Sequence, residues 1–126
     1  MRMLPILVID DSASVIRLFS HLLQLTTHSA RGVVHASSLE EALDHLPRGK
    51  FHLVFLDNRL PPHSTYHEPL RQVAELTDAP IILFTGSELD EICDGELPEA
   101  FAGYFPKHKL TKEFLEDFLA GYEDRS

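Results

Sequence analysis

The chain alternates between short apolar runs and longer stretches in which apolar residues recur with helical spacing. Five apolar runs predict strands, at residues 6–9, 32–36, 51–56, 81–84 and 101–105, and the run at 101–105 is weaker than the others. Runs of this length that are apolar at nearly every position are typical of strands buried on both faces, as in a parallel sheet. The pattern therefore predicts a sheet that is covered by helices.

Two helices are predicted in the first half of the chain. The second begins at Ser38-Leu39-Glu40-Glu41, a capping box in which serine and glutamate side chains accept hydrogen bonds from backbone amides of the first turn. The first has one apolar face, made by Val15, Ile16, Phe19, Leu22 and Leu23.

The second half of the chain predicts three more helices. Thr111 can cap the last one, which carries an apolar stripe from Phe114 to Tyr122. The helix expected within residues 88–99 is short and ends near Asp94, because Gly95 and Pro98 follow. An earlier helix is marked by Leu70, Val73, Ala74 and Leu76. Alternating strands and helices predict a doubly wound α/β domain of five βα units with right-handed crossovers.

Length and composition narrow the class of protein. A chain of 126 residues fits one domain, which we expect to span residues 1–126. The net charge is −9 and no basic run is present, so we expect no direct binding to nucleic acid. The apolar runs are far shorter than the roughly 20 residues that a membrane-spanning helix needs. We therefore expect a cytoplasmic protein that does not bind membranes.

Polar side chains stand where the predicted strands end. Asp10 and Asp11 follow the first run, Asp57 follows the run at 51–56, and Thr85 follows the run at 81–84. Lys107 lies near the end of the last strand. In doubly wound sheets the ligand binds beyond the carboxyl ends of the strands. The sequence therefore places three carboxylates, a hydroxyl and an amine at one edge of the sheet.

The chemistry of such a cluster is restrictive. Three neighbouring carboxylates repel one another, and one of them holds its proton unless a cation is present. Mg²⁺ prefers oxygen ligands and keeps several of its waters, so it would relieve the repulsion and leave positions for phosphate oxygens. Phosphoryl transfer depends mainly on positioning and on charge stabilisation, which a lysine and a hydroxyl supply. An aspartate can itself be the nucleophile and form an aspartyl phosphate.

With these residues in place, the chain resembles the receiver domain of two-component response regulators, which has a flavodoxin-like fold. The resemblance covers essentially the whole chain and implies a five-stranded parallel sheet of order 2-1-3-4-5 with helices on both faces. The matching segments are Ile9-Asp10-Asp11-Ser12, Leu56-Asp57-Asn58-Arg59-Leu60-Pro61, Phe84-Thr85-Gly86 and Tyr104-Phe105-Pro106-Lys107.

The resemblance implies a role for each acidic position. Asp57 would be the phosphoacceptor and also a ligand of Mg²⁺. Asp11 would bind the metal directly and Asp10 mostly through water. The backbone carbonyl of Arg59 would be a further ligand.

The resemblance also implies how a signal would be read. Thr85 would bond the phosphoryl group, Lys107 would pair with it, and Tyr104 would be the switch residue whose ring turns inward. That rotation would couple the site to the face formed by helix 4, strand 5 and helix 5, where a downstream protein would bind. The implied phosphodonor is a sensor histidine kinase or a histidine phosphotransfer protein, and the resemblance allows a homodimer. Such a domain is a signalling switch rather than an enzyme.

Two segments depart from the family pattern. The segment after Asp57 reads Leu60-Pro61-Pro62-His63-Ser64-Thr65, where the family continues to an Asp-Gly pair, so we expect a different loop path. His108 follows Lys107, where the family has a proline in a cis bond. A cis bond before a residue other than proline costs about 2.5–4 kcal/mol, so we expect a trans bond or an unusual loop here.

Other interpretations of the same residues stay open at this point. Asp10 and Asp11 can simply cap the first helix. The altered loops fit a receiver-like module that binds proteins without being phosphorylated. An enzyme on a related fold is less favoured, because Arg59 stands where a hydrolase acting through an aspartyl phosphate would carry a second acid. Flavin binding is disfavoured too, since the two aspartates repel phosphate.

Overall fold

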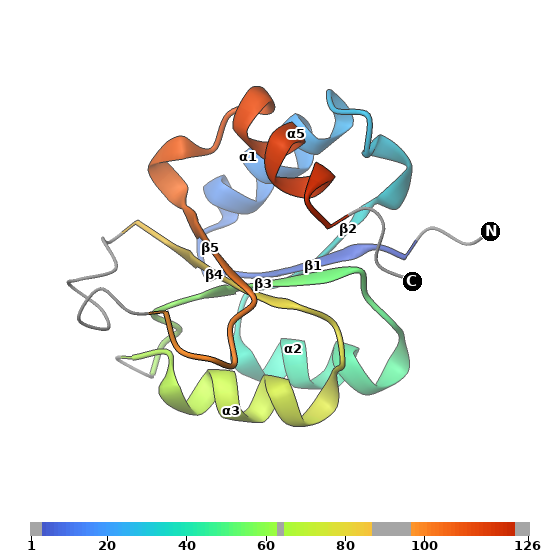
Figure 1. Cartoon of the computed structure of the whole chain (residues 1–126). Coiled ribbons are helices and arrows are strands. Elements are labelled where there is room, and N and C mark those ends of the chain that lie inside the picture. Colours follow the sequence, from blue (N-terminus) through green and yellow to red (C-terminus); the bar gives the residue numbers. More distant parts are fainter. Residues whose placement is uncertain (1–3, 63–64, 87–96, 123–126) are drawn as a thin grey trace.

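Five parallel strands form the centre of the molecule, in the order β2-β1-β3-β4-β5 (Figure 1). The structure is a computed structural model, and it describes residues 4–62, 65–86 and 97–122. The predicted fold class and strand order are confirmed. The strands are β1 (Ile6–Ile9), β2 (Val33–Ala36), β3 (Leu53–Asp57), β4 (Ile81–Thr85) and β5 (Gly103–Pro106).

The strand ends differ slightly from those that the apolar runs predict. Asp57 and Thr85 are the last residues of β3 and β4 rather than the residues after them. Both still pair with the neighbouring strand, Asp57 beside Phe84 and Thr85 beside Pro106. A hydrophobic pattern does not mark such residues as strand, because their backbone continues the ladder while their side chains are polar.

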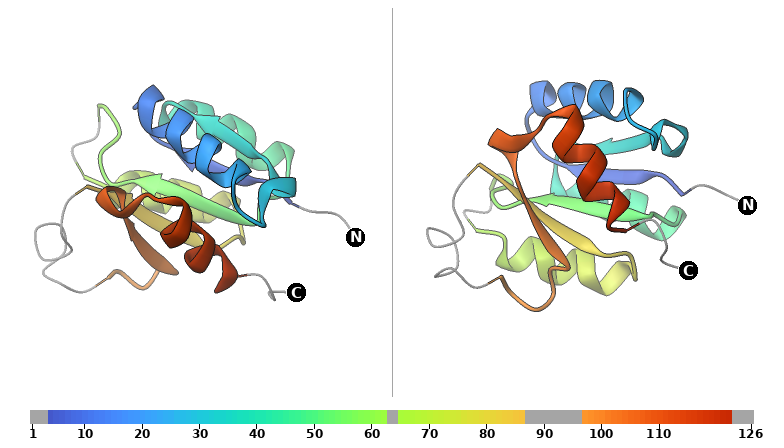
Figure 2. Two further views of the ribbon diagram at one scale, coloured as in Figure 1. Left: turned by 90° about the horizontal axis from the view of Figure 1, so that it is seen from above. Right: turned by 45° about the horizontal axis from the view of Figure 1, so that its top comes forward.

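Helices cover both faces of the sheet. Helices α1 (Ala13–Gln24) and α5 (Lys112–Ala120) lie side by side on one face, and α2 (Leu39–His45) and α3 (His67–Leu76) cover the other (Figures 1 and 2). The short 3₁₀ helices are η1 (Ser29–Arg31), η2 (Leu46–Arg48) and η3 (Lys107–Lys109). The helix predicted within 88–99 falls largely outside the described residues. No helix in the described ranges has the length and apolarity needed to cross a bilayer.

Side-chain caps fix where the helices begin. The Ser38 hydroxyl accepts a hydrogen bond from the Glu41 amide at 3.2 Å, and Thr111 caps α5 in the same way through the Phe114 amide, also at 3.2 Å. The Glu41 carboxylate accepts from the amide of Ser37 at 3.1 Å, one residue before the position that a capping box predicts. Both predicted helix starts are therefore confirmed.

The sheet separates two hydrophobic cores of different character. The core under α1 and α5, called here the α1/α5 core, holds four fully buried phenylalanines whose rings meet edge to face with centroids 5.0–6.0 Å apart. They are Phe19, Phe55, Phe84 and Phe105. The core under α2 and α3, called the α2/α3 core, is mainly aliphatic. Edge-to-face contact is a preferred arrangement of aromatic rings, so the four phenylalanines gain ring–ring contacts in addition to burial.

The apolar face predicted for α3 is only partly right. Leu70 and Val73 are buried, but Ala74 and Leu76 are exposed. The buried face is completed by Pro69 at the start of the helix. Leu76 lies in the last turn of α3 and is not a member of the α2/α3 core. The apolar face of α3 therefore covers fewer turns than the positions of its leucines suggest.

The turn between α1 and β2 is tied to α5 by Glu116. Its carboxylate accepts hydrogen bonds from the Thr27 amide at 3.0 Å and the Thr27 hydroxyl at 2.5 Å. The buried His28 places Nε2 3.0 Å from the same carboxylate. The Thr27 bonds, together with His28, lower the pKa of Glu116. These contacts hold α5 in place next to α1.

Strand β5 is an edge strand that the end of α5 approaches closely. The Tyr122 hydroxyl donates to the Ala102 carbonyl at 3.4 Å. A Cβ atom on Gly103 would lie 2.5 Å from that hydroxyl. Glycine therefore permits the tyrosine to lie against the edge of the sheet.

Candidate functional site

Strand alternation directs several polar side chains to the same side of the sheet. Neighbouring side chains of a strand point to opposite faces, so residues two apart share a face. Asp10, Asp57 and Lys107 each come two residues after a member of the α1/α5 core, namely Val8, Phe55 and Phe105. The strands bring them together at the carboxyl edge, as the sequence predicts.

Three carboxylates meet at this edge. Asp10, Asp11 and Asp57 each offer one oxygen, and these oxygens lie within 4.8 Å of one another. Asp10 is fully buried, Asp57 is buried, and Asp11 is exposed to solvent. The cluster therefore has two desolvated carboxylates inside and one open to water.

Lys107 is the cation that faces the buried pair. Its Nζ lies 2.6 Å from Asp10 Oδ2 and 3.3 Å from Asp57 Oδ1. The second oxygen of Asp10 accepts from the Ser12 amide at 2.9 Å. The Arg59 amide donates to Asp57 Oδ1 at 3.4 Å. Each oxygen of Asp10 thus has one close partner, whereas the two contacts of Asp57 Oδ1 are longer.

The environment of Asp57 changes its acidity. Burial raises the pKa of its carboxyl from the ordinary value to about 6. The Lys107 ammonium opposes this rise, and the neighbouring Asp10 adds to it. Near neutral pH the surroundings therefore disfavour the ionised form of the Asp57 carboxyl, because desolvation outweighs the single nearby cation.

The donor set fits a hard divalent cation. Three carboxylates face one ammonium group, so two negative charges are left over when all three are ionised. Carboxylate oxygens together with water are the ligands that Mg²⁺ prefers. The exposed Asp11 leaves a path from solvent. The alternative in which Asp10 and Asp11 only cap a helix is weaker, since Ser12 is the residue whose side chain caps α1.

Thr85 and Tyr104 belong to the other face of the sheet. Thr85 is fully buried and comes two residues after Leu83, a member of the α2/α3 core. Tyr104 pairs with Leu83 in the ladder and is a half-buried ring packed against the same core. The two residues of the predicted switch thus lie on neighbouring strands and on one face. Their roles stay predictions.

The loop after β5 follows the path expected for a trans bond. The Lys107–His108 peptide is trans, and the cis bond in the described ranges is instead Pro61–Pro62. Residues 107–109 form η3, in which the Leu110 amide donates to the Lys107 carbonyl at 3.1 Å. The prediction at this position is confirmed. The metal-ligand role of the Arg59 carbonyl stays a prediction.

One neighbour of Lys107 was not found from the sequence. Its Nζ lies over the ring of Phe84, 5.3 Å from the ring centre. Phe84 is the last residue of the apolar run at 81–84, and that pattern alone predicts only a buried strand residue. Its place in the ladder beside Asp57, on the same face, is the signal that could have indicated this contact.

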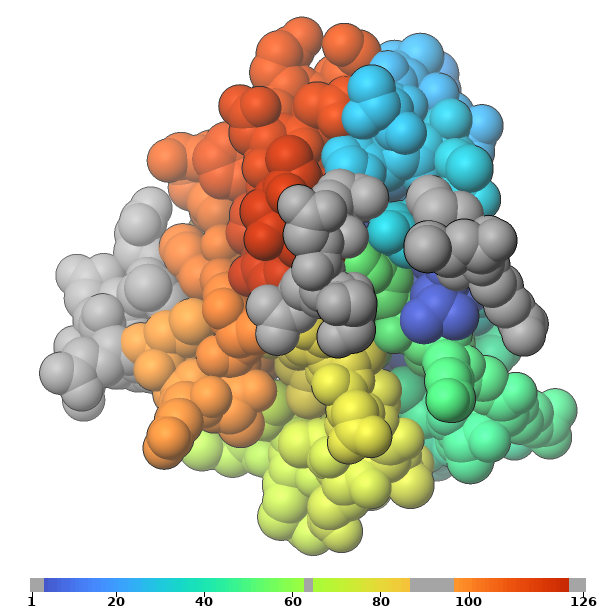
Figure 3. All heavy atoms as spheres, turned by 45° about the vertical axis from the view of Figure 1, so that its right-hand side comes forward, coloured from blue at the N-terminus to red at the C-terminus, as the bar shows by residue number. Residues whose placement is uncertain are grey.

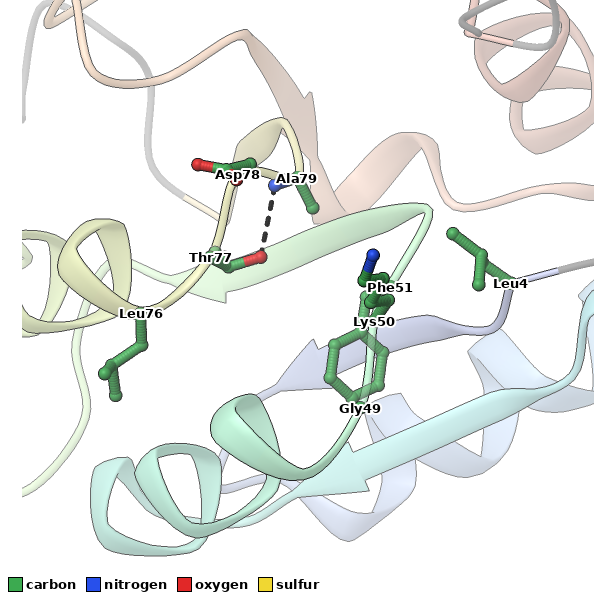
Figure 4. A pocket seen from close by; sticks show the side chains of 8 residues that line it. All are labelled: Leu4, Gly49, Lys50, Phe51, Leu76, Thr77, Asp78 and Ala79. Atoms are coloured by element: carbon green, nitrogen blue, oxygen red, sulfur yellow. Dashed lines mark hydrogen bonds between the residues drawn. The ribbon is translucent and has the colours of Figure 1, made fainter.

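A hollow of about 380 Å³ lies at the opposite edge of the sheet (Figure 4). It is formed by residues that precede β1, β3 and β4, among them Leu4, Phe51 and Ala79. Figure 3 shows this side of the molecule, where the segment after α3 borders the segment before β3. The carboxylates of the site lie at the other ends of the strands, so this hollow is not part of it.

Comparison with known families identifies the class of protein. The profile of the response regulator receiver domain matches residues 6–117. The chain therefore belongs to this family, whose members are signalling switches of two-component systems rather than classical enzymes. Comparison with curated protein sequences finds no significant match.

Solved structures support the same fold. The BeF3-activated DrrB receiver domain is 28% identical with a TM-score of 0.75, and the match covers 98% of this chain and 100% of that one. The chemotaxis response regulator CheY4 of Vibrio cholerae is 24% identical with a TM-score of 0.75, covering 96% and 99%. A CheY-like receiver domain from Methylobacillus flagellatus is 20% identical with a TM-score of 0.79, covering 97% and 100%.

Proposed function

We propose that residues 1–126 form one receiver domain that takes a phosphoryl group onto Asp57 and thereby changes its binding to a partner. The phosphodonor would be a phosphohistidine on a sensor histidine kinase or a histidine phosphotransfer protein. The observation that carries the proposal is the geometry at the carboxyl edge. There a buried Asp57 lies beside Asp10 and Asp11, with Lys107 3.3 Å from its Oδ1.

The transfer replaces the phosphorus–nitrogen bond of the donor by a phosphorus–oxygen bond to Asp57. An Asp57 carboxylate oxygen attacks phosphorus, the phosphorus–nitrogen bond of the donor breaks, and an acyl phosphate forms. The leaving imidazole keeps the electron pair of that bond and takes up a proton from solvent. Asp57 must be ionised to attack, and its pKa of about 6 leaves most of it ionised at neutral pH.

Asp10, Asp11, Asp57 and the backbone carbonyl of Arg59 would hold Mg²⁺. When bound, the ion would neutralise the charge that builds up on the transferring phosphoryl oxygens. Asp10 Oδ2 now lies 2.6 Å from Lys107 Nζ. Asp10 would release the lysine in the metal-bound state, because the metal would take over the charge of this carboxylate. Lys107 would then be available for a phosphoryl oxygen.

Thr85 and Tyr104 would convert phosphorylation into a signal. The hydroxyl of Thr85, buried at the end of β4, would bond the phosphoryl group. Tyr104 is half buried on the same face and would turn inward as that hydroxyl moves. The consequence would be a population shift at the face of β5, α5 and the helix expected within residues 88–99, where a downstream protein would bind. A homodimer would be a second outcome of the same shift.

Beryllofluoride, a phosphoryl mimic, tests the proposal. With Mg²⁺ present, it should perturb the amide NMR signals of Thr85 and Tyr104 in the wild-type domain. The Asp57→Asn variant keeps the shape of the side chain but cannot accept the group, so its spectrum should not respond. An unchanged wild-type spectrum in a folded protein would remove phosphorylation from the proposal. Partner binding that persists in Asp57→Asn would favour the phosphorylation-independent module.

A further inference from the structure

The ring of Phe84 forms a wall of the site beneath Lys107. Phe84 is fully buried and pairs with Asp57 in the ladder between β3 and β4. It comes two residues after Ile82 of the α1/α5 core, so it faces the same side as Asp10 and Asp57. The Lys107 ammonium lies 5.3 Å from the centre of this ring, within the range of a cation–π contact.

The orientation of this ring is fixed by other aromatic rings. Phe19, Phe55 and Phe105 meet it edge to face, with centroids 6.0, 5.6 and 5.6 Å away. All three are fully buried. A ring that is surrounded in this way cannot turn without disrupting the α1/α5 core. Its face is therefore aimed at the lysine independently of what the lysine binds.

The ring differs from the other partners of Lys107 in one respect. Asp10 and Asp57 hold the ammonium with full charges, but both are groups that the proposed metal and phosphoryl group would engage. The electron-rich face of Phe84 has no lone pairs to give to a metal. The side chain of Lys107 is 21% exposed, so the contact is partly shielded from water, which strengthens it.

We propose that Phe84 is a positioning residue that holds the Lys107 ammonium at the phosphoryl site through the face of its ring. The inference rests on the proposed function, because it concerns the lysine of that site. In the resting domain the two carboxylates dominate, and the ring contributes little. Once the carboxylates are engaged elsewhere, the ring keeps the ammonium at the position where it meets a phosphoryl oxygen.

NMR tests the contact itself. Protons above an aromatic ring are shifted upfield, so the Hε signals of Lys107 should lie upfield in the wild-type domain. They should return toward ordinary lysine values in Phe84→Leu. Wild-type Hε signals at ordinary values, or signals unchanged by the substitution, would overturn the inference.

Beryllofluoride affinity, measured with Mg²⁺ at saturation, tests the consequence. We expect Phe84→Leu to bind about threefold to tenfold more weakly than wild type, the range that a cation–π contact implies. Phe118→Leu is the matched control, because Phe118 meets Phe55 and Phe105 in the same aromatic cluster and is not one of the three rings that fix Phe84. Pentafluorophenylalanine at position 84 keeps the ring shape and reverses the charge of its face, so it should weaken binding as Phe84→Leu does.

The outcomes separate the two proposals. Equal losses in Phe84→Leu and Phe118→Leu, or wild-type affinity with the fluorinated ring, would show a purely structural role and overturn the inference while the proposed function stands. A wild-type domain that binds no beryllofluoride would remove the proposed function, and the positioning role with it.

Discussion

Asp57 is ionised at neutral pH in a position that disfavours its charge. Its pKa is about 6 in the folded protein, mainly because of burial, against 3.8 for an ordinary aspartate. Between these two values the folded state binds more protons than the unfolded state. The free energy of unfolding therefore falls as pH rises from about 4 to about 6 through this group, and the loss persists at higher pH.

Asp57→Asn removes this charge and should stabilise the metal-free domain at pH 7. We expect a gain of about 1 to 3 kcal/mol, which should largely disappear near pH 4, where Asp57 is protonated in the folded state. Urea denaturation in EDTA at the two pH values measures the difference. Asp117→Asn, an exposed carboxylate of α5, is the control. A less stable Asp57→Asn at pH 7 would show that the Lys107 contact outweighs burial.

Lys107 Nζ lies 2.6 Å from Asp10 Oδ2, an oxygen of the carboxylate cluster that would hold the proposed metal. Removing this cation in Lys107→Met should therefore make Mg²⁺ bind more tightly, by about threefold to tenfold, since the carboxylates lose their competing partner. The same variant should bind beryllofluoride more weakly. Calorimetric titration with Mg²⁺ gives the first affinity, and titration with beryllofluoride at saturating Mg²⁺ gives the second. Lys109→Met changes the charge equally two residues away, and equal effects in the two variants would argue against direct competition.

At the scale of elements, β5 and α5 meet where only glycine leaves room. A methyl group on Gly103 would displace the Tyr122 hydroxyl, which lies 2.5 Å from the Cβ position. Because the tyrosine end can rotate away, we expect Gly103→Ala to cost about 1 kcal/mol, the value of a lost hydrogen bond and some packing. In a Tyr122→Phe background the same substitution should cost less. Equal costs in both backgrounds, measured by urea denaturation, would place the strain elsewhere, for example at Ile82.

The sequence predicts most elements of this fold for identifiable reasons. The strand runs are apolar on both faces, and Ser38 and Thr111 mark helix starts by hydrogen bonds that depend only on local spacing. Helical spacing places Leu76 on the apolar face of its helix, but this residue is exposed, because spacing does not reveal how far the opposing core extends. Residues 87–96, where the fourth helix was expected, are not among those described.

The candidate site, like the fold, is predicted by the sequence only in part. Asp10, Asp57 and Lys107 could be predicted to meet, because each follows a strand and parallel strands end at one edge. The 2.6 Å contact between Lys107 and Asp10, and the ring of Phe84 beneath the lysine, could not. Both depend on the rotamer of a long side chain and on the two-residue periodicity of three different strands, which are not adjacent in the sequence.

At the scale of the whole molecule, metal binding should be visible as stability. Mg²⁺ that binds only the folded state should raise the free energy of unfolding by about 1.4 kcal/mol at a tenfold excess over its dissociation constant. EDTA should reverse the effect, and Asp11→Asn should reduce it. Thermal unfolding must be compared at equal ionic strength, because a chain of net charge −9 also gains from screening. An equal response to sodium chloride would contradict a specific site.

The two outer strands of the sheet limit how another molecule can attach to it. Strands β2 and β5 form the edges, and each has only four residues. Strand β5 ends in Pro106, which has no amide hydrogen to offer, and Tyr122 lies against its start. Short, interrupted edges of this kind are poor templates for adding a strand. Such edges do not favour growth of the sheet into aggregates, and a partner must recognise the domain by its surface side chains rather than by extending its backbone ladder.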